Sequence, residues 1–276
     1  MRIPPTILTL LAGMGLVLAG LWVGQNVNLL PVDASANAPV YDELFKVLFS
    51  IGTILLVGIV GLVVYSLLRF RRRAGELGDG AAIEGNLPLE ILWTAIPAVV
   101  VLFVGIYSYD IYDRMGGMTP LNDHSMHAMA SEQRTWGGIS PVSFDGSDGP
   151  PPLPVDVTAM QFAFIFHYPD SDITTGELHV PVGQPVALQM KALDVIHAFW
   201  VPQFRLKQDV IPGQPTLLSF TPTRPGSYPI VCAELCGPYH GGMRSTVIVE
   251  EPDSFAAWVA KNSPNAPAEN AAVVQS

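Results

Sequence analysis

An almost unbroken apolar run covers residues 44–68, and four arginines follow it closely, Arg69, Arg71, Arg72 and Arg73. A run of this length can cross the hydrocarbon core of a bilayer as one helix, which satisfies its own backbone hydrogen bonds. The cytoplasmic ends of membrane helices are enriched in Lys and Arg. We therefore expect a membrane helix that ends in the cytoplasm.

A second apolar run covers residues 89–111 and would bring the chain back across the membrane. Trp93 stands near its start, and Tyr107, Tyr109 and Tyr112 stand near its end, where aromatic side chains suit the membrane interfaces. The Gly- and Ala-rich residues 74–88 would connect the two runs. Residues 39–112 are thus predicted to form a transmembrane helical hairpin, and the chain after it lies outside the cytoplasm.

The N-terminal residues 1–38 allow two interpretations. Residues 7–23 are apolar and follow Arg2, and small residues stand at 34–38 in the order Ala, Ser, Ala, Asn, Ala. One interpretation is a secretory signal with a small-residue cleavage site, and the other is an additional membrane anchor. Both place the residues that follow outside the cytoplasm.

Residues 113–154 are rich in Gly, Ser, Pro and Met and are predicted to form a flexible linker. A group of soft ligands, His124, Met126, His127 and Met129, stands within this linker. It could collect copper for delivery to another site, but a solvated, flexible tether is the favoured interpretation. The last residues, 263–276, are predicted to be a disordered tail.

From residue 155 to residue 262 the pattern changes to short strands between Pro-, Gly- and Asp-rich turns. This pattern predicts a β-sandwich or barrel, closed by a short helix at residues 254–261. The fold class is therefore a membrane-anchored all-β protein. The expected strands are residues 155–158, 162–168, 176–180, 185–190, 197–201, 216–220, 226–231 and 243–249.

Composition limits the kinds of partner. The chain is 49% hydrophobic and only 14% charged, and its net charge is −10. From Asp113 onward it carries sixteen acidic and eight basic residues. An acidic domain argues against nucleic acid as a ligand and favours a basic partner protein or a metal ion.

One loop holds every cysteine of the chain. Cys232, Cys236, His240 and Met243 stand at intervals of four, four and three residues. Thiolates, imidazoles and thioethers select copper over harder metals. A mononuclear blue-copper site needs a single cysteine, whereas two thiolates could bridge two copper ions if a second imidazole were available, and His197 is a candidate. Taken alone, the two cysteines would indicate a disulfide or half of a zinc site. His197, His240 and Met243 in register with them favour copper instead.

These residues resemble subunit II of the haem-copper cytochrome c oxidases. The family carries a loop Cys-x-Glu-x-Cys-x3-His-x2-Met and an upstream Asp-x-x-His, which this chain matches from Asp194 to His197 and from Cys232 to Met243. The resemblance extends over about residues 44–261. It implies a cupredoxin fold around a binuclear copper centre, CuA. The implied copper ligands are His197, Cys232, Glu234, Cys236, His240 and Met243.

The resemblance also implies a function. CuA would accept electrons from a soluble carrier, such as cytochrome c or a small copper protein, and pass them to haem in subunit I, which reduces dioxygen to water and pumps protons. Subunits I and III and membrane lipid would be the partners, and haem would lie in the partner subunit only. The Glu234 carboxylate would bind magnesium at the border with subunit I, and Asp194 would hold the site or help docking.

Two further roles follow from the resemblance. Glu90 matches the family's Glu-x-x-Trp-Thr-x-x-Pro, in which the glutamate lies at the mouth of a proton pathway. Phe162 occupies the place of a tryptophan that takes the electron from the donor. This departure makes a donor other than cytochrome c plausible, and the phenylalanine-rich stretch resembles the cyanobacterial branch.

Two other functions compete with this interpretation. A quinol-oxidase subunit would keep the architecture and lack the copper ligands, which are all present here. A membrane-tethered copper chaperone would need an exposed, exchangeable site. We expect instead the electron-accepting subunit of a proton-translocating cytochrome c oxidase, since no other catalytic constellation is evident in the sequence.

Overall fold

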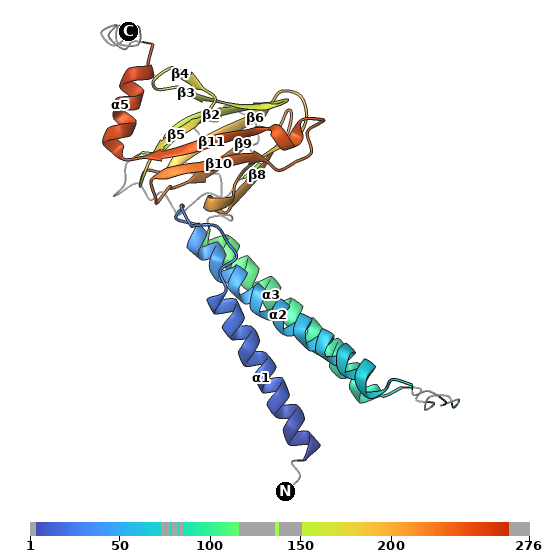
Figure 1. The fold of residues 1–276 in the computed structure, drawn as a ribbon. Coiled ribbons are helices and arrows are strands. Elements are labelled where there is room, and N and C mark those ends of the chain that lie inside the picture. Colours follow the sequence, from blue (N-terminus) through green and yellow to red (C-terminus); the bar gives the residue numbers. More distant parts are fainter. Residues whose placement is uncertain are drawn as a thin grey trace. The chain divides into compact units, whose positions relative to one another are not determined.

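The computed structural model describes residues 4–72, 75, 78, 82, 85–115, 136–137 and 151–264. These residues belong to two compact units. One unit comprises Met1–Leu29 with Asp42–Asp110, and the other comprises Leu30–Tyr41 with Ile111–Ser276. The first is helical and the second is mainly β-structure (Figure 1).

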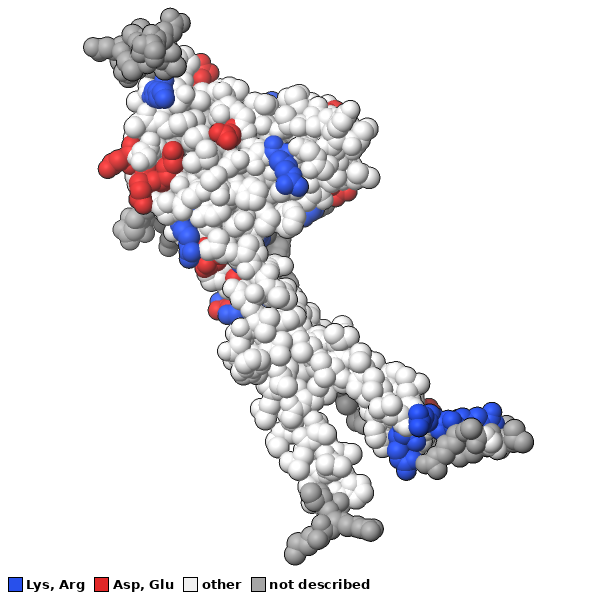
Figure 2. Space-filling model, in the orientation of Figure 1, with Lys and Arg blue, Asp and Glu red and all other residues white. Residues whose placement is uncertain are grey.

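The helical unit contains α1 (Pro5–Asn26) and most of α2 (Ala38–Arg69) and α3 (Leu87–Arg114). Within the described part of the chain, all three are long and apolar enough to cross a membrane. The predicted runs at 44–68 and 89–111 lie inside α2 and α3, which extend beyond them at both ends. In Figure 2 basic side chains gather where α2 ends, in agreement with a cytoplasmic boundary there.

Helix α1 packs against α2 through two glycines. Gly20 and Gly24 are buried, and they are spaced so that both lie on one face of the helix. A Cβ on Gly24 would lie 2.9 Å from the Lys46 carbonyl oxygen and would collide with the Ser50 side chain. A Cβ on Gly20 would collide with Ile54. Close approach over small residues is how helices associate in a bilayer, where apolar burial alone gives little preference.

The β-structure unit contains two sheets. The first has strand order β1-β9-β6-β2-β3-β4, and the second has β5-β11-β10-β7-β8. Short 3-10 helices η1 (Pro202–Phe204) and η2 (His240–Gly242) and helix α5 (Pro252–Asn262) complete it. The strands are β1 (Trp136–Gly137), β2 (Leu153–Met160), β3 (Ala163–Tyr168), β4 (Ile173–Thr175), β5 (Leu178–Pro181), β6 (Val186–Ala192), β7 (His197–Val201), β8 (Leu206–Val210), β9 (Thr216–Phe220), β10 (Gly226–Cys232) and β11 (Arg244–Glu250).

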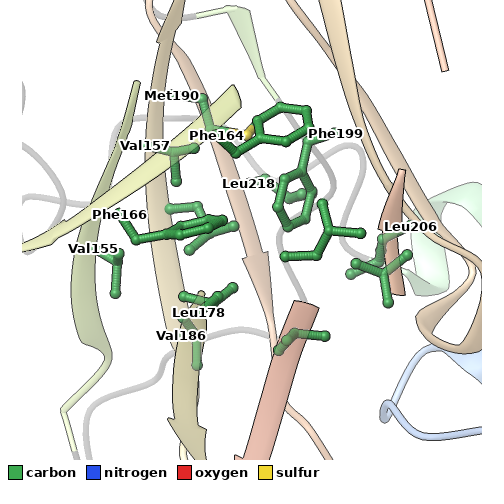
Figure 3. Packing of buried hydrophobic residues seen from close by; sticks show 14 of the residues in the cluster. Val155, Val157, Phe164, Phe166, Leu178, Val186, Met190, Phe199, Leu206 and Leu218 are labelled. Atoms are coloured by element: carbon green, nitrogen blue, oxygen red, sulfur yellow. The ribbon is translucent and has the colours of Figure 1, made fainter. Parts of the chain in front are cut away.

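The core lies between the two sheets and follows the alternation of the strands. In β3, Phe164, Phe166 and Tyr168 are buried, and the residues between them are only partly buried. Phe164 meets Phe199 of the other sheet edge to face, with ring centroids 5.9 Å apart (Figure 3). Side chains that point to one face of each strand thus fill the space between the sheets.

All eight predicted strands are present, with ends displaced by a few residues, and the closing helix is confirmed as α5. Strands β4 and β8 were missed. Strand β4 has only three residues, and β8 buries only its two ends, Leu206 and Val210, around three more polar residues, so neither shows an alternating pattern. Strand β1 falls inside the expected linker and pairs with β9.

Residues outside the described part include His124, Met126, His127, Met129 and most of the predicted tail. The segment Leu30–Tyr41, in contrast, is described and packs on the β-structure. Ala34 and Ser35 are buried, and the Ser35 hydroxyl donates to the Phe204 carbonyl at 2.8 Å. The Ala34 N–H donates to Gln203 O, and the Thr223 N–H donates to Ala34 O, each at 3.0 Å.

The packing of α1 on α2 generates a prediction. We expect Gly24→Leu to weaken their contact by about 1–3 kcal/mol, because the new side chain must displace Ser50 or the backbone at Lys46. The thermal unfolding midpoint of the helical circular dichroism signal, measured in detergent, should fall. Gly13→Leu is the control, because a Cβ at Gly13 meets nothing within 4 Å. Equal midpoints for the two variants would contradict this packing.

Candidate metal centre

Three neighbouring strands bring the predicted ligands together at one end of the second sheet. His197 begins β7, Cys232 ends β10, and Met243 directly precedes β11. Antiparallel pairing places Cys232 opposite Phe199 of β7, and the Cys232 N–H donates to Met243 O at 3.1 Å. The loop between β10 and β11 then carries Glu234, Cys236 and His240 over the same end.

The candidate ligand atoms form one connected cluster. The two sulfurs, Cys232 Sγ and Cys236 Sγ, are 3.8 Å apart. His197 Nδ1 lies 3.9 Å from Cys232 Sγ, and His240 Nδ1 lies 3.6 Å from Cys236 Sγ. The Glu234 carbonyl oxygen is 3.3 Å from Cys232 Sγ, and Met243 Sδ is 3.7 Å from Cys236 Sγ. Each thiol therefore has one imidazole and one weaker donor beside it.

Both cysteines are free and buried, so they are not joined in a disulfide. Burial, and to a smaller extent the neighbouring Cys232, raise the pKa of the Cys236 thiol to about 11. Two thiols held this close in a dry pocket would repel each other as thiolates unless a cation lay between them. This environment suits a bound metal better than a free dithiol.

The chemistry of the donors fits copper. His197, Cys232 and Cys236 offer ligand atoms that all lie within 4.8 Å of one another, and all three residues are buried. Met243 is fully buried as well, with its sulfur in the same pocket. Two thiolates, two imidazoles and a thioether form a soft donor set, which favours copper over magnesium, calcium or manganese.

Asp194 fixes the orientation of His197. His197 Nε2 donates to Asp194 Oδ1 at 2.8 Å, which leaves Nδ1 without a proton and directed at Cys232. Burial alone would raise the pKa of Asp194, but the hydrogen bonds from His197, Gln161 and Val195 outweigh it and lower the pKa to about 2. Asp194 therefore stays ionised and holds the imidazole in the tautomer that a metal needs.

Gln161 joins the two ligand-bearing loops, a role that the sequence analysis missed. Its backbone N–H donates to Asp194 Oδ2 at 2.7 Å, and its side-chain Nε2 donates to the Cys236 carbonyl at 2.6 Å. A Cβ on Gly237, where φ is +138°, would lie 2.8 Å from this amide nitrogen. Only glycine suits both this backbone conformation and this approach. In the sequence, the only indication of this role was that Gln161 directly precedes Phe162, a candidate site residue.

Phe162 lies between the core and the loop of Cys236. It is half-buried, packs against the core, and meets the ring of Tyr239 edge to face at 5.4 Å between centroids. Tyr239 itself is 72% exposed and directly precedes His240. The aromatic side chain nearest to solvent at this position is therefore Tyr239 and not Phe162.

Glu90 lies at the start of α3. Asn86 Oδ1 accepts from the Leu89 N–H, and Glu90 Oε1 accepts from the Asn86 N–H, each at 3.2 Å. These reciprocal bonds are those of a helix cap, which satisfies amides that have no partner within the helix. The cap gives Glu90 a structural role independent of any proton transfer.

The hydrogen bond from His197 to Asp194 generates a second prediction. We expect Asp194→Asn to weaken copper binding by about 10–100-fold, because the amide can donate to Nε2 and thus favour the wrong tautomer. Copper retained by the purified protein against a competing chelator measures the change. Asp209→Asn is the control, since Asp209 pairs only with exposed Lys207 in the described structure. Equal retention in both variants would contradict the proposed orientation.

Comparisons with known proteins agree with this geometry. Residues 20–111 match the family described as "Cytochrome C oxidase subunit II, transmembrane domain", and residues 170–251 match "Cytochrome C oxidase subunit II, periplasmic domain". The first match covers the end of α1, all of α2 and most of α3, and the second covers the strands from β4 to β11. The second description also agrees with the arginines after α2, which place the β-structure unit outside the cytoplasm.

Relatives match along most of the chain. "Cytochrome c oxidase subunit 2" of Thermostichus vulcanus is 49% identical over 95% of this chain and 86% of its own length. The protein of the same name from Synechocystis sp. is 46% identical over 99% and 87%. The crystal structure of the periplasmic domain of subunit II of cytochrome oxidase from Bradyrhizobium japonicum is 30% identical, covers 42% of this chain and 96% of that chain, and has a TM-score of 0.39. By the two family matches and these relatives, the chain belongs to the cytochrome c oxidase subunit II family, the membrane-anchored electron-accepting subunits of haem-copper terminal oxidases.

Proposed function

We propose that this chain holds a binuclear CuA centre, with Cys232 and Cys236 as bridging thiolates and His197 and His240 as terminal imidazoles. Met243 and the Glu234 carbonyl are the weak ligands. The observation that carries the proposal is the pair of free sulfurs 3.8 Å apart, each with an imidazole Nδ1 beside it. A copper pair bound there supplies a centre that takes up and releases one electron at a time.

In electron transfer, the role of the protein is to hold the metal ligands in place and to exclude water from the site. His197, Cys232, Cys236 and Met243 are each at most 3% exposed, and two strands and a hydrogen-bonded loop fix them. A ligand set that is already in place needs little rearrangement when the charge of the centre changes. The same burial disfavours a copper chaperone, whose ligands must open to exchange the metal.

The partners follow from the family. We propose that a soluble carrier, cytochrome c or a small copper protein, reduces the centre, and that haem in subunit I receives the electron. Subunit III and lipid complete the surroundings. We assign the side-chain carboxylate of Glu234 to a magnesium ion at the border with subunit I. The backbone carbonyl of the same residue faces Cys232.

We also propose that residues 1–38 are retained as a third membrane span. Two packed features support this proposal: the glycines of α1 that fit against α2, and the small residues at 34–38, which are mostly buried against loops of the β-structure. Burial explains the small residues without a cleavage site. The Gly24→Leu variant distinguishes the two ideas, because a leader that is removed would leave the mature protein unchanged.

The copper pair generates the third prediction. The purified, copper-loaded protein is expected to be purple, to contain two coppers per chain, and to show an electron-spin signal shared by both nuclei. Cys236→Ser should abolish all three properties, because one thiolate cannot bridge the pair. Met243→Leu should keep the colour and shift the reduction potential. Met190→Leu, a buried methionine in the β-sandwich core, is the control.

A blue protein with one copper would rule out the binuclear centre. A colourless protein that releases copper readily to a chelator would favour the chaperone instead.

We further propose that Glu90 lies at the mouth of a proton pathway into subunit I. Glu90→Gln keeps the Oε1 acceptor, so the cap on Asn86 should survive while the ionisable group is lost. We expect slower oxygen consumption and proton uptake with an unchanged copper spectrum. Asn86→Ala is the control, because it removes the other half of the cap and leaves the carboxylate. Proton uptake that fell only in the control would assign Glu90 to the helix cap alone.

A further inference from the structure

The first half of the loop between β10 and η2 has little support from its own backbone. Within the part of the chain that the structure describes, residues 234–236 form no backbone-to-backbone hydrogen bond. Two side chains reach this stretch. The Cys232 thiol lies 3.3 Å from the Glu234 carbonyl, and Gln161 Nε2 donates to the next cysteine's carbonyl at 2.6 Å. A thiol that binds a metal gives up its proton, so the first of these hydrogen bonds is lost in the loaded site. The Gln161 amide is then the hydrogen bond that holds Cys236.

Gln161 and Phe162 lie against this loop from the same side. A Cβ built on Gly237 would lie 2.8 Å from Gln161 Nε2 and 3.2 Å from the nearest carbon of the Phe162 ring. The Phe162 ring also meets the ring of Tyr239 edge to face, with centroids 5.4 Å apart. These two consecutive residues, which we call the turn clamp, therefore cover the loop from Cys236 to Tyr239.

The turn clamp is also bonded to the loop that carries His197. The Gln161 backbone N–H donates to Asp194 Oδ2 at 2.7 Å, and Asp194 Oδ1 accepts from His197 Nε2 at 2.8 Å. Gln161 lies between β2 and β3, which the pairing of Met160 with Ala163 closes into a hairpin. The clamp thus stands on the first sheet, whereas the donor atoms belong to the end of the second sheet and its loop.

We propose that Gln161 is a positioning residue of the metal centre, and that Phe162 acts with it as a support of the ligand loop. The proposal rests on the CuA function above. The amide fixes the Cys236 backbone, so that the sulfur of Cys236 stays at its distance from the sulfur of Cys232. Phe162 then has a role in the site that does not require it to pass electrons. Without the clamp the two thiolates would no longer be held alike, and the two metal positions would become unequal.

The test uses the full chain, purified in detergent and loaded with copper. Gln161→Leu removes the amide and keeps the backbone N–H that bonds to Asp194. We expect it to lower the copper retained against a chelator roughly tenfold, and to disturb the electron-spin signal shared by the two nuclei. Gln161→Glu, which has the same shape but offers no donor at neutral pH, should do the same. Gln184→Leu is the matched control, because Gln184 Nε2 donates to the Pro151 carbonyl at 2.9 Å outside the metal centre.

Phe162→Leu tests the supporting role separately. A leucine covers less area than a phenyl ring and cannot meet Gly237 and Tyr239 together, so the electron-spin signal should change before any donor is added. Phe255→Leu is the control, because Phe255 is also a half-buried ring that packs against the core. An unchanged signal in Phe162→Leu, with only slower reduction by a soluble donor, would make Phe162 an electron-entry residue and remove it from the clamp.

The stability of the metal-free chain separates positioning from folding. Gln161→Leu and Gln184→Leu each lose one hydrogen bond from an amide to a carbonyl, so their thermal unfolding midpoints should fall by similar amounts. Only Gln161→Leu should change the metal signals. Equal metal signals in the two variants would overturn the proposal. So would a much lower midpoint for Gln161→Leu and Gln161→Glu than for the control, because the turn would then serve folding in general.

Failure of the positioning role and failure of the CuA function give different results. If Gln161 does not position the loop, the Gln161→Leu variant keeps the two-copper signal and the copper retention of the unaltered chain. If the chain holds no CuA centre, the unaltered chain itself lacks the two-copper signal.

Discussion

The antiparallel pairing of β7, β10 and β11 is the constraint on which the metal centre depends. It aligns the start of β7 with the end of β10 and the start of β11, so that His197, Cys232 and Met243 meet although 35 residues separate the first two. Backbone hydrogen bonds from Cys232 to Met243 and from Ala233 to Ala198 lock this alignment. The remaining ligands need only one short loop to reach the same pocket.

A second layer of hydrogen bonds turns this alignment into a defined site. Asp194 sets the tautomer of His197, and Gln161 ties Asp194 to the loop of Cys236. Gly237 allows the close approach of Gln161, so a backbone conformation and a side-chain amide act together. Because these groups hydrogen-bond to both loops, they connect the two halves of the donor set. Rigidity of this kind suits a centre that must change charge without changing shape.

The same turn also links the centre to the surface. Gln161 contacts the ligand loops from within, while Phe162 supports Tyr239 at the solvent boundary. A residue that fixes the ligands and a residue that supports the exposed ring of Tyr239 are thus neighbours in the chain. In the helical unit, a different constraint applies: Gly20 and Gly24 let α1 approach α2 closely, as helices in lipid require.

The apolar helices, the β-sandwich, eight of its strands and the candidate donor set could be predicted from the sequence, the donor set partly through its resemblance to the family. Apolar length, two-residue alternation and ligand spacing are all local patterns, and each is visible without a fold. The folded chain was needed to show that Gln161 connects the loops, that the ring of Tyr239 packs against Phe162, and that the small residues at 34–38 pack against the sandwich. Those contacts join residues from 33 to 189 positions apart, as between Gln161 and Asp194 or between Ala34 and Thr223, and nothing in a local pattern specifies them. The sequence leaves helix α1 open as leader or anchor for the same reason, because the fit of its glycines is visible only where α2 lies against them.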